Sequence, residues 1–335
     1  MNMPIQPTHL TQIAKLPYLC MNELNLSIMQ KVSEIITKPD YKPFKPKTRK
    51  NAQTYTPYYV SNTPHTDHVF ELLLNCQPIN AQLREHSLFK ISQSVMAVQK
   101  AYANLGYNSN GPINPHLLHN EHYVETILPA VVSFSNELKH HSTSRIAMND
   151  CVRRTALINE IKKANVSVMK KLFKTQQRFD LNHFTYIFNM NGCEFFKDKK
   201  TLEKILTQQI THIIDKFHDD HQAEILTLFF RVQPDLSNNY VLTVYCATER
   251  ECQPLSMEVY ISRREDGSLN FAPHSNITLS IFENHYSMDI QGVDGINEKT
   301  WKAIFSQMLT KYNYVYYESE FVSPKFIYIE CDSKK

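Results

Sequence analysis

The sequence predicts an α+β protein, in which a mainly helical N-terminal half is followed by a mostly antiparallel sheet with helices on one face. Apolar residues recur at three- and four-residue spacing up to about residue 180, and strand-like alternation dominates after it. A chain of 335 residues is long enough for about two domains. We expect a helical segment over 1–37, a basic proline-rich linker or arm over 38–65, a helical domain over 66–178 and an α+β domain over 179–335.

The helical half contains several segments with an apolar stripe. Pro17 and Pro129 interrupt two of these segments, and Gly106 fits the C-cap of another. Asn114 followed by Pro115 marks a further helix start, because proline is favoured at the first helical position. The spacing predicts helices over 8–37, 80–105, 121–140 and 147–175.

The second half reads as strands joined by turns, with two amphipathic helices. Glu258, Tyr260 and Ser262 alternate with apolar residues, which predicts a strand with one wet face. The pattern predicts helices over 201–217 and 297–311, and strands over 183–190, 224–232, 240–247, 256–263, 276–282, 285–290, 312–317 and 326–330.

Several functional classes lack their signatures. The six glycines form no dinucleotide-binding, P-loop or nucleophile-elbow motif, and neither HExxH nor a kinase signature occurs. The seven cysteines include no CxxC pair, which favours reduced thiols over a disulfide framework or a zinc knuckle. The N-terminus has no secretory pattern and no apolar run reaches membrane-spanning length. We therefore expect a cytoplasmic protein with no membrane association, no cofactor and no metal.

The charge is unevenly distributed, although the net charge is only +3. Residues 1–180 hold 21 Lys and Arg against 12 Asp and Glu, whereas the remainder holds 15 against 21. On a helical wheel of 147–175, the cations share one arc of about 100° beside an apolar arc. A row of cations on one face suits a row of phosphates, and a solvated surface is the simpler alternative. The cations of this basic face are Arg153, Lys163, Lys170, Lys171 and Lys174.

The proline-rich segment is a second cationic candidate. Its cations alternate with Tyr41, Phe44, Tyr55 and Tyr58, and cations with aromatic faces bind single-stranded nucleic acid by charge and stacking. A flexible linker is the alternative. The cations of this arm are Lys42, Lys45, Lys47, Arg49 and Lys50.

Metal-binding patterns are weak. The densest histidine cluster is formed by His116, His119 and His122, yet the outer two diverge by about 120° on a helix. His218 to His221 reads as a polar helix end.

Hydrolase patterns are incomplete as well. Cys193 precedes His274 and Asp289 or Asn284 in an order that a cysteine hydrolase could use, without a local signature. Asp235, with Glu249 and Glu251, resembles a nuclease pattern that lacks its lysine. Buried thiols and solvated acids are the simpler interpretations.

The tyrosines near the C-terminus also have two interpretations. Tyr312, Tyr314 and Tyr316 alternate along one expected strand face, with Tyr317 on the other. A tyrosine nucleophile is conceivable there, but aromatic residues are favoured in strands for packing alone.

Three hypotheses for the function follow. The first is a nucleic-acid-binding protein, of the kind associated with replication or a mobile element, that uses the basic helix; DNA and RNA stay open. The second is a metal- or cysteine-dependent hydrolase. The third is a protein-interaction module or effector, whose basic helix docks on an acidic protein partner.

Overall fold

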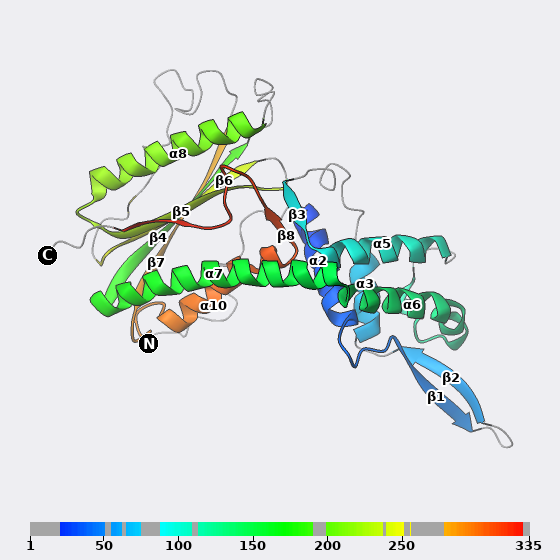
Figure 1. Ribbon diagram of the computed structural model, residues 1–335. Helices are drawn as coiled ribbons and strands as arrows, with labels where there is room; N and C mark the ends of the chain where they lie inside the picture. Colours follow the sequence, from blue (N-terminus) through cyan, green and yellow to red (C-terminus); the bar gives the residue numbers. More distant parts are fainter. Residues whose placement is uncertain are drawn as a thin grey trace. The chain divides into compact units, whose positions relative to one another are not determined.

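The computed structural model describes residues 21–50, 55–61, 65–74, 88–108, 113–189, 199–236, 239–250, 255 and 278–330. The described chain forms two compact units (Figure 1). The helical unit comprises the described residues from 21 to 157 together with 309–316. The sheet unit comprises 158–308 and the residues from 317 onward. No described helix is long and apolar enough to cross a membrane.

The helical unit packs its helices around an aliphatic core. Val32 of α2, Val98 of α5 and Val131 of α6 are fully buried. Asn114 and Asn120 cap η1 and α6, because their side chains accept hydrogen bonds from the first free backbone N–H groups. The elements are α2 (Met21–Ile36), α3 (His65–Leu74), β3 (Phe89–Ile91), α5 (Gln93–Asn108), η1 (Pro115–Leu117), α6 (Glu121–Ser142), the start of α7 (Arg145–Thr175), η2 (Thr310–Asn313) and β8 (Val315–Tyr317).

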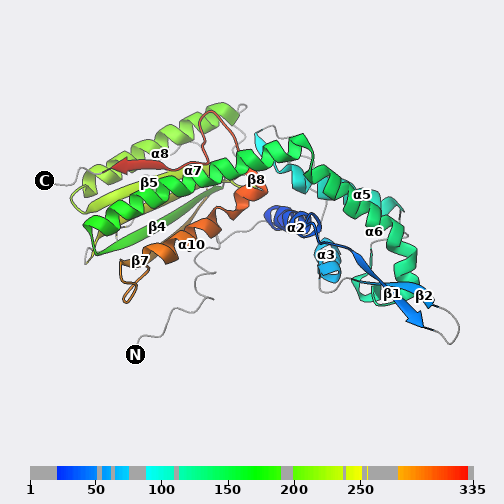
Figure 2. The same cartoon turned by 60° about the horizontal axis from the view of Figure 1, so that its bottom comes forward.

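The proline-rich segment forms an antiparallel hairpin of β1 (Phe44–Lys50) and β2 (Tyr55–Ser61). The backbone is extended, as its prolines predict, but it pairs along its whole length instead of running free (Figure 2). Pro46 is tolerated because each strand of a two-stranded sheet is an edge strand. Tyr41 and Phe44 are buried and anchor the base of the hairpin.

The sheet unit contains a five-stranded antiparallel sheet in the order β7-β4-β6-β5-β9. Strand β4, the second in this order, pairs with β6 on one side and with the edge strand β7 on the other. The elements are β4 (Arg178–Asn189), α8 (Lys199–His221), β5 (Ile225–Pro234), β6 (Tyr240–Glu249), β7 (Thr278–Asp289), α10 (Glu298–Met308) and β9 (Ile327–Glu330).

Helices pack against both faces of this sheet, not against one face alone as predicted (Figure 1). On one face of the sheet, Phe184 of β4 contacts Phe217 of α8. On the opposite face, Phe179 of β4 contacts Phe173 of α7. Trp301 of α10 lies on the α7 side. The sequence assigned α7 to the helical half, although its second half covers the sheet.

Several element boundaries differ from the predictions. The expected strands 276–282 and 285–290 are one continuous strand, β7, because nothing between them breaks the ladder with β4. Residues 89–91 form β3 instead of helix, and α5 extends past Gly106. Pro129 lies inside an unbroken α6 on its exposed side. Residues 312–314 belong to η2 or follow it, and the expected strand 256–263 lies outside the described residues.

Candidate nucleic-acid interface

The second half of α7 is held on the sheet unit by an apolar face with one polar anchor. Ile161, Met169 and Leu172 are buried at helical spacing. Asn165, on the same face, accepts a hydrogen bond of 2.8 Å from the indole N–H of Trp301. This packing fixes the rotation of α7, and therefore it fixes which side chains face solvent.

The opposite side of α7 presents a row of lysines. Lys163, Lys170 and Lys174 are exposed and lie within a narrow arc, with Lys171 beside them, also exposed. At 1.5 Å per residue, Lys163 lies about 10 Å along the axis from Lys170, and Lys174 follows after about 6 Å. We call these four side chains the lysine stripe. The structure brings together four of the five predicted cations of the basic face.

The acidic residues of α7 do not neutralise the lysine stripe. The helix carries eight Lys or Arg against two Asp or Glu. Asp150 pairs with Arg154 at 2.9 Å. Glu160 pairs at 2.7 Å with Lys325, which places a further cation beside the start of the stripe. Within the described chain, no ion pair joins Lys163, Lys170 or Lys174 to an acid.

Arg153 lies apart from the lysine stripe, in the helical unit. Its guanidinium lies 5.6 Å from the ring centroid of Tyr316. Three exposed side chains in this stretch of the helix are apolar: Ile146 and Val152 are each 68% exposed and Met148 is 57% exposed. This part of α7 therefore lacks the uniform cationic character that the wheel predicted.

The hairpin retains a cationic surface and loses part of its expected stacking platform. Lys42, Lys45 and Lys47 are exposed, and the last two lie on the same face of β1. Tyr41 and Phe44 are buried and cannot stack on bases. Arg49 and Lys50 belong to β1, and their side chains, like those of Tyr55 and Tyr58, lie outside the described structure. The hairpin therefore presents exposed lysines, but two of the four aromatic residues predicted to stack on bases, Tyr41 and Phe44, are buried.

The hydrolase candidates are not assembled by the described residues. Cys193, His274 and Glu251 lie outside the described structure. Asp235 closes the β5–β6 loop, where it accepts hydrogen bonds of 2.9 Å from the backbone and side chain of Asn239. Glu249 lies at the other end of β6, roughly 30 Å away for ten extended residues. Asp235 and Glu249 cannot share a metal ion.

The remaining motifs have structural explanations. His116, His119 and His122 are exposed, and the described residues contain no group of three His, Cys, Asp or Glu side chains that could hold a metal ion. His218 and His221 end α8 and lie beside Asp219 and Glu224. The C-terminal tyrosines are all buried: Tyr312, Tyr314, Tyr316 and Tyr317.

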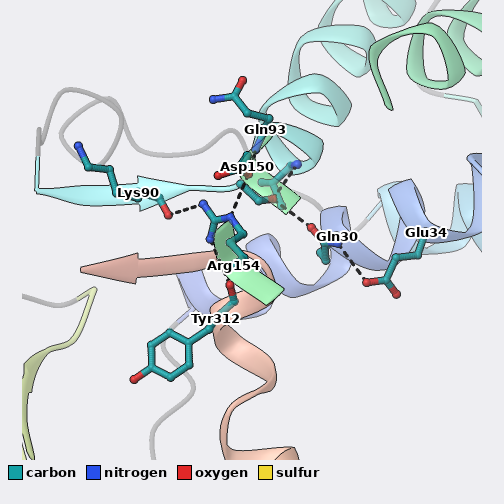
Figure 3. Close-up of polar contacts among 9 residues, drawn as sticks. Gln30, Glu34, Lys90, Gln93, Asp150, Arg154 and Tyr312 are labelled. Carbon is teal, nitrogen blue, oxygen red and sulfur yellow. Dashed lines mark hydrogen bonds and ion pairs between the residues drawn. The ribbon is translucent and has the colours of Figure 1, made fainter. Parts of the chain in front are cut away.

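A buried arginine network in the helical unit was missed by the sequence reasoning (Figure 3). Arg154 is 3% exposed. Besides its ion pair with Asp150, it donates hydrogen bonds to the backbone carbonyls of Lys90, at 2.8 Å, and Tyr312, at 3.2 Å. Arg154 falls on the apolar side of the α7 wheel, four residues before Ile158. A charged residue on the apolar side of a helix was the sequence feature that could have indicated a buried arginine.

A buried carboxylate in the sheet unit was missed as well. Glu203 of α8 accepts hydrogen bonds from the hydroxyls of Tyr240, Tyr317 and Ser319. Burial, together with the neighbouring carboxylate, raises the pKa of both tyrosines above its ordinary value. Three hydroxyl donors satisfy Glu203 and favour a structural role. Glu203 lies on the same helix face as the buried Leu206 and Ile210, and this spacing in the sequence could have indicated that it is buried.

A ladder of rings crosses the other face of the sheet. His183 stacks on Tyr245 at 4.4 Å between ring centroids, and Tyr245 stacks in turn on Phe229. Burial, assisted by the charge of Arg231, lowers the pKa of His183 to about 4. His183 is therefore neutral near pH 7 and belongs to the core.

Comparison with protein-family models, with curated proteins and with solved structures finds no match for this chain.

Proposed function

We propose that this protein binds nucleic acid through the lysine stripe of α7. The observation that carries the proposal is the exposure of Lys163, Lys170, Lys171 and Lys174 on one face of a helix whose own acids are paired elsewhere. Cations held at fixed positions replace condensed counterions around phosphates, and the release of these counterions favours binding.

The stripe contacts the backbone of the nucleic acid and does not read its sequence. Lysine is a point charge on a flexible stem, which suits phosphate oxygens. The exposed cations of the hairpin, Lys42, Lys45 and Lys47, add a second electrostatic contact. The expected binding is therefore strongly dependent on salt and weakly dependent on sequence.

The test is fluorescence anisotropy with labelled single-stranded and duplex oligonucleotides of DNA and of RNA at several salt concentrations. Three phosphate contacts contribute roughly 2 to the slope of log K against log salt on single strands and roughly 3 on duplex. The variant Lys163→Gln/Lys170→Gln/Lys174→Gln should lose this part of the slope and bind about tenfold or more weakly at low salt.

A matched control removes the same charge from the opposite side of the sheet. Lys200, Lys204 and Lys216 are exposed on α8. Their triple change to glutamine should leave the salt slope almost unchanged. Equal losses in the two triple variants would show that only net charge matters, and absence of binding at low salt would refute the proposal.

A further inference from the structure

We propose that Asp180 of β4 and His285 of β7 form a binding site for a divalent transition-metal ion. The two residues lie on adjacent strands near one end of the sheet, on the face that packs against α8. The lysine stripe belongs to the helix on the other face. The metal site is therefore independent of the proposed nucleic-acid binding.

The separation of the two donor atoms fits a shared ion. Nε2 of His285 lies 3.6 Å from Oδ1 of Asp180. This distance is too long for a hydrogen bond. Two ligand atoms at 2.0–2.2 Å from a tetrahedral zinc ion lie roughly 3.4 Å apart. A small adjustment of either side chain closes the difference.

The imidazole is oriented for this role by its neighbours. Nδ1 of His285 lies 3.0 Å from the Oδ1 of Asn182. The amide of Asn182 is held in turn by its hydrogen bond to Thr248, at 3.4 Å. Because Asn182 offers an oxygen, Nδ1 carries the proton and Nε2 directs its lone pair at Asp180. Metal-binding histidines have this arrangement, in which the second ring nitrogen donates to an outer partner.

The environment of the Asp180 carboxylate also favours a bound cation. Asp180 is 6% exposed, and its Oδ1 has no hydrogen-bond partner among the described residues. A lone pair of Nε2 facing this oxygen is repulsive, and a buried carboxylate oxygen without a partner costs free energy. A bound cation removes both costs. The side chain of His285 is 40% exposed, which leaves a route for the ion.

The donor set selects the class of metal. One imidazole nitrogen and one carboxylate oxygen suit Zn²⁺, Co²⁺ or Ni²⁺, whereas Mg²⁺ and Ca²⁺ prefer oxygen alone. No third His, Cys, Asp or Glu joins the pair in the described part of the chain. The other coordination positions are therefore taken by water, as at an open site.

The test is isothermal titration of the full chain with zinc chloride at neutral pH. Wild type should bind one zinc ion at this site, and His285→Asn and Asp180→Asn should each weaken that binding at least tenfold. Asn182→Ala, which removes the outer partner, should weaken it about tenfold. The fluorescence of Trp301 confirms that each variant is folded.

The control is His221→Asn. Nδ1 of His221 also lies 3.6 Å from a carboxylate oxygen, that of Glu224, but this carboxylate is 46% exposed. The control should bind zinc as wild type does. Equal zinc affinity in all the proteins would overturn the proposal. No zinc binding by wild type would also overturn it.

Discussion

The stability of the sheet unit should depend on pH through His183. Because burial lowers its pKa from 6.5 to about 4, the folded protein keeps this imidazole neutral where the unfolded chain already binds a proton. Stability is therefore fully present above about pH 6.5 and is lost as the pH falls toward 4. At 1.36 kcal/mol per pKa unit, the loss from this one group is about 3 kcal/mol.

The assay compares wild type with His183→Phe, which keeps an aromatic ring against Tyr245 and cannot be protonated. Urea unfolding is followed between pH 7 and pH 4 by the emission of Trp301, the only tryptophan, which is fully buried in the sheet unit. Other groups titrate equally in both proteins, so only the difference between the two unfolding free energies is interpreted.

Wild type should lose about 3 kcal/mol more than His183→Phe over this range. His212→Asn, at an exposed position on α8, should follow wild type at every pH. A difference between wild type and His183→Phe that stays constant from pH 7 to pH 4 would refute the reasoning.

Three further perturbations test the packing described above. Arg154→Met should destabilise the helical unit by about 3–5 kcal/mol, because Asp150 and two backbone carbonyls lose the buried guanidinium that they bind. Urea unfolding followed by circular dichroism measures this loss, and a value below about 1 kcal/mol would contradict the network. Glu203→Leu should cost about 3 kcal/mol or more in Trp301-detected unfolding, and Glu203→Gln distinctly less, since the amide still accepts hydrogen bonds; equal costs would contradict this role. Gly295→Ala should cost about 1–3 kcal/mol, because a Cβ there would lie 2.4 Å from the carbonyl oxygen of Ser287; unchanged thermal unfolding would count against that contact.

Local periodicity was sufficient for the longest helices. The helix predicted over 147–175 is α7, Arg145–Thr175, because its apolar stripe persists over many turns. The α+β class followed from the same signal. The lysine stripe was predictable too, since burial of one face of a helix exposes the other.

Features that depend on distant contacts could not be predicted. One of the two carbonyls that Arg154 binds belongs to Tyr312, 158 residues away in the sequence, and Glu203 contacts Tyr317, 114 residues away. Neither partner can be inferred from local spacing. The pairing of Asn182 with His285 depends on the register of β4 and β7, in which a shift of one residue would move His285 to the other face.

The division of the chain between the two units has a consequence for synthesis on the ribosome. The helical unit, otherwise built from residues before 158, needs residues 309–316, which supply the carbonyl of Tyr312 to Arg154. The edge strand β9 reaches β5 only after about a hundred intervening residues have been made. Neither unit can therefore complete its fold during translation until this late part of the chain has emerged, and until then Arg154 lacks the carbonyl of Tyr312 and β5 lacks its pairing with β9.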